Sequence, residues 1–156
     1  MFITKDFELK IKAHSFFPVF QKNFNSANIT NIDLSSENKD LKTINTDSEE
    51  ELSAYIFEKL RSENTTYGMG GYAEDRSVYR SSDLFGTGKD ARSFHLGTDI
   101  WCKAGTNIYS PKDALVHSFN NNNSYKDYGL TVILQHTIKG IRFFTLFLKN
   151  CLIRIK

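Results

Sequence analysis

The sequence has few of the features that mark several common classes of protein. Its two cysteines, Cys102 and Cys151, are too few for a disulfide scaffold, and no C-x-x-C pair is present for a zinc knuckle or a thioredoxin-like motif. No run of about eighteen apolar residues occurs that would span a membrane. The N-terminus mixes charges and lacks the apolar segment of a signal peptide, so we expect a soluble, cytoplasmic chain.

The charge of the chain is nearly balanced, with 20 Lys and Arg against 18 Asp and Glu, a formal net charge of +2 at pH 7. Such a balance creates no field that recruits nucleic acid or anionic lipid. We therefore expect no nucleic-acid partner and no membrane span. The length of 156 residues, 40% of them apolar, suits one ordinary globular domain with room for a second small one.

Residues 1–66 are interpreted as an N-terminal region with one helix. Residues 1–46 mix short apolar pieces with polar runs and follow no single period, which predicts a loosely organised arm or a small subdomain. From there the pattern sharpens, because Asp47 or Ser48 can cap a helix and acidic residues follow. Apolar residues then recur at helical spacing, which predicts a helix over residues 48–62.

Residues 67–156 are interpreted as a β domain. Five glycines between Tyr67 and Lys89 interrupt regular structure, which predicts a long connecting loop. After Ser93, short β-branched and aromatic runs alternate with turn residues, as is typical of an antiparallel sheet. We therefore expect a mainly β chain with an N-terminal α element. The expected strands cover residues 98–102, 107–110, 114–119, 130–136 and 141–148.

His95 and Asp99 are the residues with the clearest chemical potential. They stand four residues apart with Gly97 between them to let the backbone bend, so imidazole and carboxylate can reach one divalent cation. Nitrogen and oxygen ligands together suit zinc. Taken alone, such a pair is more often a histidine beside an unrelated aspartate, because zinc usually has three protein ligands and a water molecule.

The sequence around this pair resembles the lysostaphin/LytM-type zinc metallopeptidases, a family of peptidoglycan endopeptidases. The motifs follow in the family's order and with similar spacing from about Phe94 to Phe147, which is roughly half of the chain. A less specific similarity extends upstream over residues 70–80. The matching motifs are His95-Leu-Gly-Thr-Asp99, Ala104-Gly-Thr-Asn-Ile-Tyr-Ser-Pro111, Ala114-Leu-Val116, Asp127-Tyr-Gly129 and Val132-Ile-Leu-Gln-His136 with Gly140.

The resemblance implies that His95 and Asp99 are two zinc ligands. In the family, the third ligand is the second histidine of a downstream His-x-His. The first histidine of that motif, together with one in a Tyr-x-x-Tyr-Gly-His segment, orients water and stabilises the oxyanion. The implied reaction is attack of zinc-activated water on a peptide carbonyl of peptidoglycan.

The sequence departs from the family pattern where that chemistry is completed. Leu148-Lys149-Asn150-Cys151 stands in place of Gly-His-Leu-Ser, and none of the four histidines lies in a His-x-His. We therefore expect a truncated, incomplete β-sheet domain of this type, with no catalytic residues and weak or absent zinc binding, inactive alone. The alternatives are a non-catalytic β-module that binds peptidoglycan or a protein, or a partner chain that supplies the missing histidines.

The remaining candidates have structural interpretations. We expect His136 to be structural or to support a ligand, and His117 to face solvent on a strand, whereas His14 lies outside the resemblance. Cys102 is expected to be a small buried thiol on the opposite face of its strand from the ligands. Trp101 shares the ligands' face, so it either walls the site or packs in the core.

The stretch from Ile141 to Ile155 carries apolar side chains on both faces, which is typical of a strand in the middle of a covered sheet. Its expected neighbours are missing from the sequence. We therefore expect an unpaired apolar edge that promotes self-association.

Overall fold

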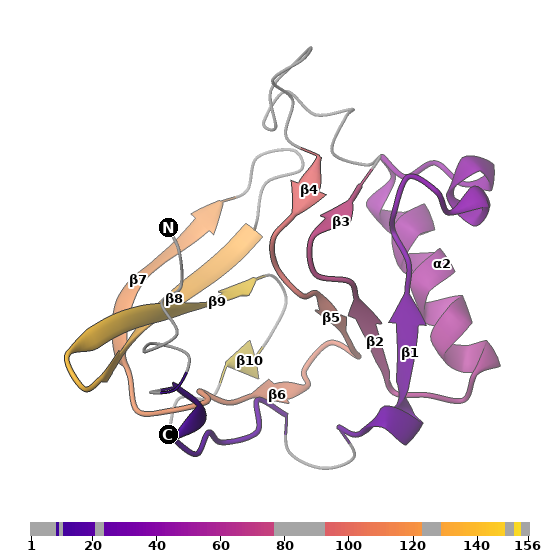
Figure 1. The fold of residues 1–156 in the computed structure, drawn as a ribbon. Coiled ribbons are helices and arrows are strands. Elements are labelled where there is room, and N and C mark those ends of the chain that lie inside the picture. Colours follow the sequence, from indigo (N-terminus) through magenta and orange to yellow (C-terminus); the bar gives the residue numbers. More distant parts are fainter. Residues whose placement is uncertain are drawn as a thin grey trace. The chain divides into compact units, whose positions relative to one another are not determined.

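The computed structural model describes residues 9, 11–20, 24–76, 93–122, 129–148 and 152–153. Among these residues the chain is mainly β, with one long helix and partial antiparallel sheets (Figure 1). This confirms the predicted mainly β class, whereas the peptidase-type fold stays a prediction. No helix in the described ranges is both long and apolar enough to cross a membrane.

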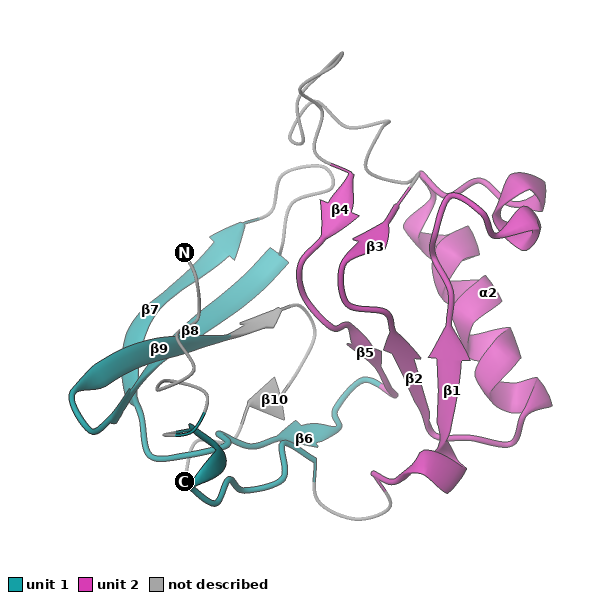
Figure 2. Cartoon of the chain, viewed as in Figure 1, with its two compact units in different colours: residues 1–22, 104–156 teal, residues 23–103 magenta. Residues whose placement is uncertain are grey.

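The chain divides into two compact units (Figure 2). Unit 1 consists of residues 1–22 and 104–156, and unit 2 consists of residues 23–103. The boundary expected between residues 66 and 67 falls within unit 2, and the division into an N-terminal region and a peptidase-like domain stays a prediction.

Helix α2 (Glu49–Ser62) confirms the helix expected over residues 48–62. The side chain of Ser48 caps it by accepting a hydrogen bond from the N–H of Glu51 at 3.2 Å. Three acidic residues in the first turn favour the positive end of the helix dipole. One face of the helix contributes to the core of unit 2, which consists of Ile32, Leu34, Leu41, Ile56 and Leu60.

The sheet of unit 2 packs against α2. Strand β1 (Ile29–Ile32) pairs in parallel with β2 (Tyr67–Gly70), and β2 pairs antiparallel with β5 (Ile100–Trp101). The helix contacts both β1 and β2. Two shorter strands, β3 (Glu74–Asp75) and β4 (Phe94–His95), form a separate antiparallel pair.

The pairs β2–β5 and β3–β4 share one register. Gly68 lies opposite Trp101, and further along the same two chain segments Glu74 lies opposite His95, with no slip between the two points. Between these strands, the N–H of Gly70 donates to the carbonyl oxygen of Asp99 at 2.9 Å. The two segments therefore behave as one interrupted antiparallel ladder, with His95 at one end of the interruption and Asp99 at the other.

Two expectations for unit 2 need correction. Residues 29–32 form the half-buried strand β1, so the loose-arm alternative is wrong for this segment, and residues 67–70 form β2 instead of a loop. The reason is close packing: a Cβ at Gly68 would lie 2.8 Å from Cγ1 of Ile32 and 3.1 Å from Cδ1 of Leu60. The glycine lets the strand approach its neighbours, so it indicates contact here and not a break. Residues 77–89 of the expected loop lie outside the described residues.

Unit 1 contains a three-stranded antiparallel sheet of β7 (Leu115–Asn122), β8 (Gly129–Ile138) and β9 (Ile141–Leu148). These strands confirm the expected antiparallel sheet for residues 114–119, 130–136 and 141–148, with small shifts of the strand ends. Among the described strands β9 pairs with β8 alone and so lies at the edge of this sheet. Strands β6 (Asn107–Ile108) and β10 (Leu152–Ile153) pair in parallel, which the sequence did not indicate. The strands expected over residues 98–102 and 107–110 therefore pair elsewhere, as β5 with β2 and as β6 with β10.

Candidate functional site

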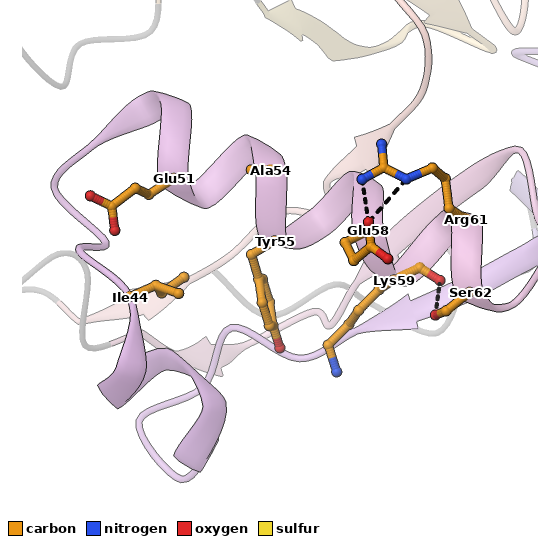
Figure 3. Close-up of a pocket in the computed structure, with 8 residues that line it drawn as sticks. All are labelled: Ile44, Glu51, Ala54, Tyr55, Glu58, Lys59, Arg61 and Ser62. Carbon is orange, nitrogen blue, oxygen red and sulfur yellow. Dashed lines mark hydrogen bonds and ion pairs between the residues drawn. The ribbon is translucent and has the colours of Figure 1, made fainter.

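An open groove with a volume of about 530 Å³ runs along one face of α2 (Figure 3). Two exposed ion pairs lie at this groove, Arg61 with Glu58 and Lys59 with Asp40, the latter at 3.3 Å. Exposed ion pairs of this kind contribute little to the stability of the fold, and they are typical of an ordinary solvated surface. No histidine or cysteine lines the groove, and its carboxylates are those of Glu51 and Glu58 on α2.

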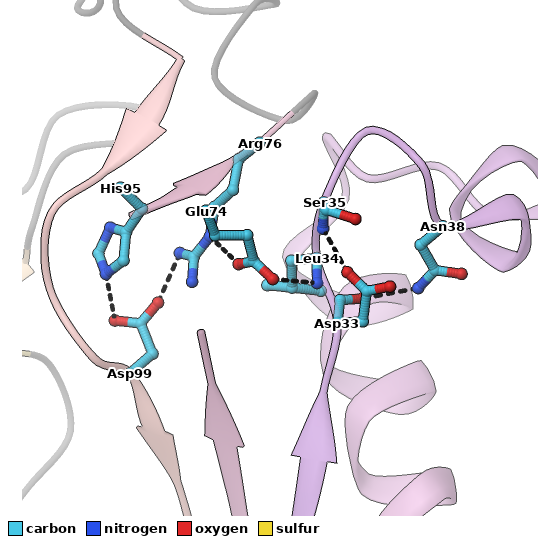
Figure 4. Close-up of polar contacts among 8 residues, drawn as sticks. All are labelled: Asp33, Leu34, Ser35, Asn38, Glu74, Arg76, His95 and Asp99. Atoms are coloured by element: carbon cyan, nitrogen blue, oxygen red, sulfur yellow. Dashed lines mark hydrogen bonds and ion pairs between the residues drawn. The ribbon is translucent and has the colours of Figure 1, made fainter. Parts of the chain in front are cut away.

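The structure brings the predicted ligands His95 and Asp99 together in unit 2 (Figure 4). His95 ends β4, and Asp99 directly precedes β5. Nε2 of His95 lies 3.4 Å from Oδ1 of Asp99. Their side chains are 18% and 29% exposed, so both are largely covered yet still reach solvent.

Gly97 makes room for the imidazole ring of His95. A Cβ at this position would lie 3.0 Å from Nε2 and 3.3 Å from Cε1 of the ring. Distances this short force a neighbour to move. The glycine therefore does more than allow the backbone to bend, because it also permits the ring to lie where Asp99 faces it.

Arg76 holds Asp99 from the other side. Its Nη1 donates to Oδ2 of Asp99 at 2.5 Å, and its Nε donates to Oε2 of Glu74 at 2.7 Å. Arg76 is 3% exposed, and a guanidinium this deeply buried is stable only when it is paired. The second oxygen of Glu74, Oε1, accepts a hydrogen bond from the N–H of Leu34 at 2.9 Å. Figure 4 shows this path from the core backbone to His95.

The roles of Glu74 and Arg76 were not predicted from the sequence. Both fall in the upstream segment of weaker similarity, where no role was assigned to them. Their spacing could have predicted an ion pair between them, because residues two apart on a strand lie on the same face. The contact with Leu34 had no local signal, because it joins residues far apart in the chain.

Gly70 and Trp101 shape the space around the guanidinium. A Cβ at Gly70 would lie 3.0 Å from Cη2 of Trp101 and 3.1 Å from Nη2 of Arg76. Trp101 also packs against the core cluster of unit 2. The tryptophan therefore packs against the core, as one of its two interpretations proposed, and its ring and the guanidinium both border Gly70.

The electrostatic environment favours the neutral imidazole. Burial lowers the pKa of His95 below its ordinary value, and Arg76 adds to this, although Asp99 and Glu74 act in the opposite direction. Neutral imidazole is the form that offers a lone pair to a metal. The charges of Glu74 and Arg76 cancel each other, which leaves the cluster with the negative charge of Asp99.

Nε2 of His95 and Oδ1 of Asp99 are spaced as two ligands of one zinc ion would be. A tetrahedral zinc with ligands at about 2.0–2.1 Å holds any two of them about 3.4 Å apart. This is the separation of Nε2 of His95 and Oδ1 of Asp99. Within the described ranges, no group of three or more His, Cys, Asp or Glu residues is arranged to hold a metal ion.

His136 has the structural environment expected for it in unit 1. It is 0% exposed, and its ring stacks on Phe143 with centroids 4.8 Å apart. Nδ1 lies 3.2 Å from the carbonyl oxygen of Asp113, and Nε2 lies 2.8 Å from Oγ1 of Thr145. A carbonyl oxygen can only accept, so Nδ1 carries the proton. Both ring nitrogens are thus engaged within the protein.

The other single residues are placed as follows. His117 is exposed on β7, as expected, and its ring meets Phe144 edge to face at 5.2 Å. His14 is half-buried near the N-terminus. Cys102 is half-buried, so the expectation of a fully buried thiol is wrong. Cys151 lies outside the described residues.

Comparisons of the chain with protein-family models, curated proteins and solved structures gave no match. The resemblance to the lysostaphin/LytM-type peptidases therefore rests on the motifs of the sequence.

Proposed function

We propose that this chain contains the zinc-binding part of a lysostaphin/LytM-type metallopeptidase domain, with His95 and Asp99 as two of the zinc ligands. The observation that carries the proposal is the 3.4 Å separation of Nε2 of His95 and Oδ1 of Asp99, which suits two ligands of one tetrahedral ion. The family motifs that contain and follow the pair support the substrate class, a peptide bond of peptidoglycan.

The side chains of the cluster have different tasks in this proposal. His95 and Asp99 each offer one lone pair, and Gly97 leaves the imidazole the space to do so. When bound, zinc acts as a Lewis acid that lowers the pKa of its water and polarises a peptide carbonyl. Arg76 occupies the second carboxylate oxygen of Asp99, so only Oδ1 is offered to the metal.

This chain alone is expected to bind zinc weakly and to hydrolyse no peptide. Catalytic zinc sites have three protein ligands, and the sequence lacks the His-x-His that supplies the third in the family. In the part of the chain that the structure describes, no three metal-ligating residues gather. A site with two ligands holds zinc poorly and leaves water without the histidines that orient it.

Zinc titration of the purified chain against a chromophoric competitor tests the proposal. We expect weak binding that falls at least about tenfold in both His95→Ala and Asp99→Ala, because each removes one of two ligands. His117→Ala is the matched control, since it removes an exposed histidine from another unit. Equal affinity in all four proteins would contradict the proposal, as would loss of binding in His117→Ala alone.

One observation favours a second candidate, a β-module that binds a peptidoglycan peptide or a protein without catalysis. Large exposed apolar side chains occur on all three strands of the unit 1 sheet, and exposed apolar surface marks interaction sites. They are Leu115, Val116 and Phe119 on β7, Leu130 on β8 and Phe144 on β9.

Co-sedimentation with insoluble peptidoglycan in the presence of a chelator tests this second candidate. Binding that persists without zinc and is lost in Phe119→Ser would favour it, because Phe119 is among the most exposed apolar side chains. Binding that requires zinc, or no binding at all, would contradict it.

A further inference from the structure

We propose that Arg76 is a positioning residue for the ligand Asp99, and that Glu74 holds Arg76 in place while offsetting its charge. This inference rests on the zinc site proposed above and extends it to residues that the family motifs do not assign. It follows from the contacts, burial and charges of the cluster in Figure 4.

The two carboxylate oxygens of Asp99 have different partners. Oδ2 accepts a hydrogen bond from Nη1 of Arg76 at 2.5 Å, and Oδ1 faces Nε2 of His95 at 3.4 Å. A carboxylate held at one oxygen cannot rotate freely about its terminal bond. Arg76 therefore fixes the direction of the remaining oxygen, the one offered to the metal.

Arg76 is itself anchored. Its Nε donates to Glu74 at 2.7 Å, and Glu74 accepts a hydrogen bond from the backbone of Leu34, a core residue, at 2.9 Å. The guanidinium uses its planar fork to reach both carboxylates at once, which a lysine ammonium cannot do with the same geometry. Asp99 is thus connected through the side chains of Arg76 and Glu74 to the backbone of the core of unit 2.

The fold also reserves space for the guanidinium. Gly70, opposite Asp99 in the ladder, has no side chain where Nη2 of Arg76 and the Trp101 ring approach. The same glycine N–H donates to the carbonyl oxygen of Asp99 at 2.9 Å. Both the backbone and the side chain of Asp99 are therefore held in position.

Charge is the reason for assigning a role to Glu74. A guanidinium next to Asp99 would by itself repel a divalent cation and cancel the charge of the ligand. Glu74, with its side chain only 9% exposed and bonded directly to Arg76, neutralises that cation. The cluster keeps one net negative charge for the metal, and removal of the Glu74 charge is expected to weaken metal binding.

Titrations of the full chain with Zn²⁺ and Co²⁺ test this inference. We expect Arg76→Lys and Glu74→Gln to weaken zinc binding by about 10- to 100-fold, as changes to groups that support metal ligands do. Arg61→Lys and Glu58→Gln are matched controls, since they alter the exposed ion pair on α2, and both should bind as the unchanged chain does.

A separate readout distinguishes positioning from a general structural role. The visible absorption of bound Co²⁺ reports ligand geometry, so we expect an altered spectrum at saturation in Arg76→Lys. Far-UV circular dichroism and the metal-free Tm check that the fold is retained. If Arg76→Lys does not fold, Glu74→Gln carries the test, because it keeps the shape of the side chain.

Two outcomes overturn the inference, and they can be told apart. If both variants retain the zinc affinity and cobalt spectrum of the unchanged chain while His95→Ala and Asp99→Ala lose binding, the inference is wrong and the zinc site stands. If the unchanged chain binds neither metal through His95 and Asp99, the proposed function fails and the inference fails with it.

Discussion

Gly97 leaves the space that the imidazole of His95 occupies, since a Cβ on the glycine would lie 3.0 Å from Nε2. The smallest residue of the His-Leu-Gly-Thr-Asp motif thus leaves room for the ring of its histidine. The position of the ring relative to Asp99 depends on this missing side chain.

Replacement of Gly97 by alanine is expected to displace the imidazole and to weaken zinc binding by about tenfold or more. Gly71→Ala is the control, because its Cβ would meet Glu74 only at 3.7 Å, an ordinary contact. Competition titration with zinc measures the difference. Equal affinity of Gly97→Ala and Gly71→Ala would show that ring placement does not limit binding.

Gly68→Ala is expected to destabilise unit 2 by about 1–3 kcal/mol through overpacking. Its Cβ would lie 2.8 Å from Cγ1 of Ile32 and 3.1 Å from Cδ1 of Leu60, both in the core. Urea unfolding of Gly68→Ala and Gly71→Ala provides the comparison. A free energy of unfolding equal in the two variants would mean that β2 is less tightly packed than the structure indicates.

Thr145→Val is expected to lower the free energy of unfolding by about 1–3 kcal/mol, because it leaves Nε2 of the buried His136 without its hydrogen-bond partner. The hydroxyl of Thr145 lies 2.8 Å from that nitrogen, and valine keeps the shape of the side chain. Thr137→Val, on the exposed side of β8, is the control. Zinc affinity should be the same in both variants, and a loss of affinity in Thr145→Val alone would contradict a structural role for His136.

The apolar edge at β9 predicts concentration-dependent self-association. Phe144→Lys places a charge on this exposed edge strand and should shift the chain toward monomer. Phe94→Lys, at an exposed position in unit 2, should not. Analytical ultracentrifugation over a range of concentrations measures the effect, and a monomer at every concentration in the unchanged chain would argue against the edge as an interface.

The elements predicted correctly from the sequence are those defined by local signals. Helix α2 follows from the cap at Ser48 and from apolar spacing, and β9 follows from a continuous apolar and β-branched run. Strands β1 and β2 were missed because their identity depends on contacts between distant residues. The glycines of β2 are typical of a loop, and only the nearby core side chains show why they belong in a strand.

The candidate site was predictable only where it depends on residues close together in the sequence. His95 and Asp99 lie four residues apart in one motif, so their proximity could be expected from spacing. Glu74 and Arg76 belong to the opposite segment of the ladder, and they come near His95 and Asp99 only through the pairing of β3 with β4. No local pattern determines that pairing or the hydrogen bond from Leu34 to Glu74.

The most direct test of the proposed zinc site is the ¹⁵N NMR signal of the histidine ring nitrogens during addition of zinc. We expect the His95 ring signals to shift while those of His136 and His117 do not, and Asp99→Ala to abolish the shift. If the His95 signals stay unchanged while another histidine responds, His95 and Asp99 are not zinc ligands.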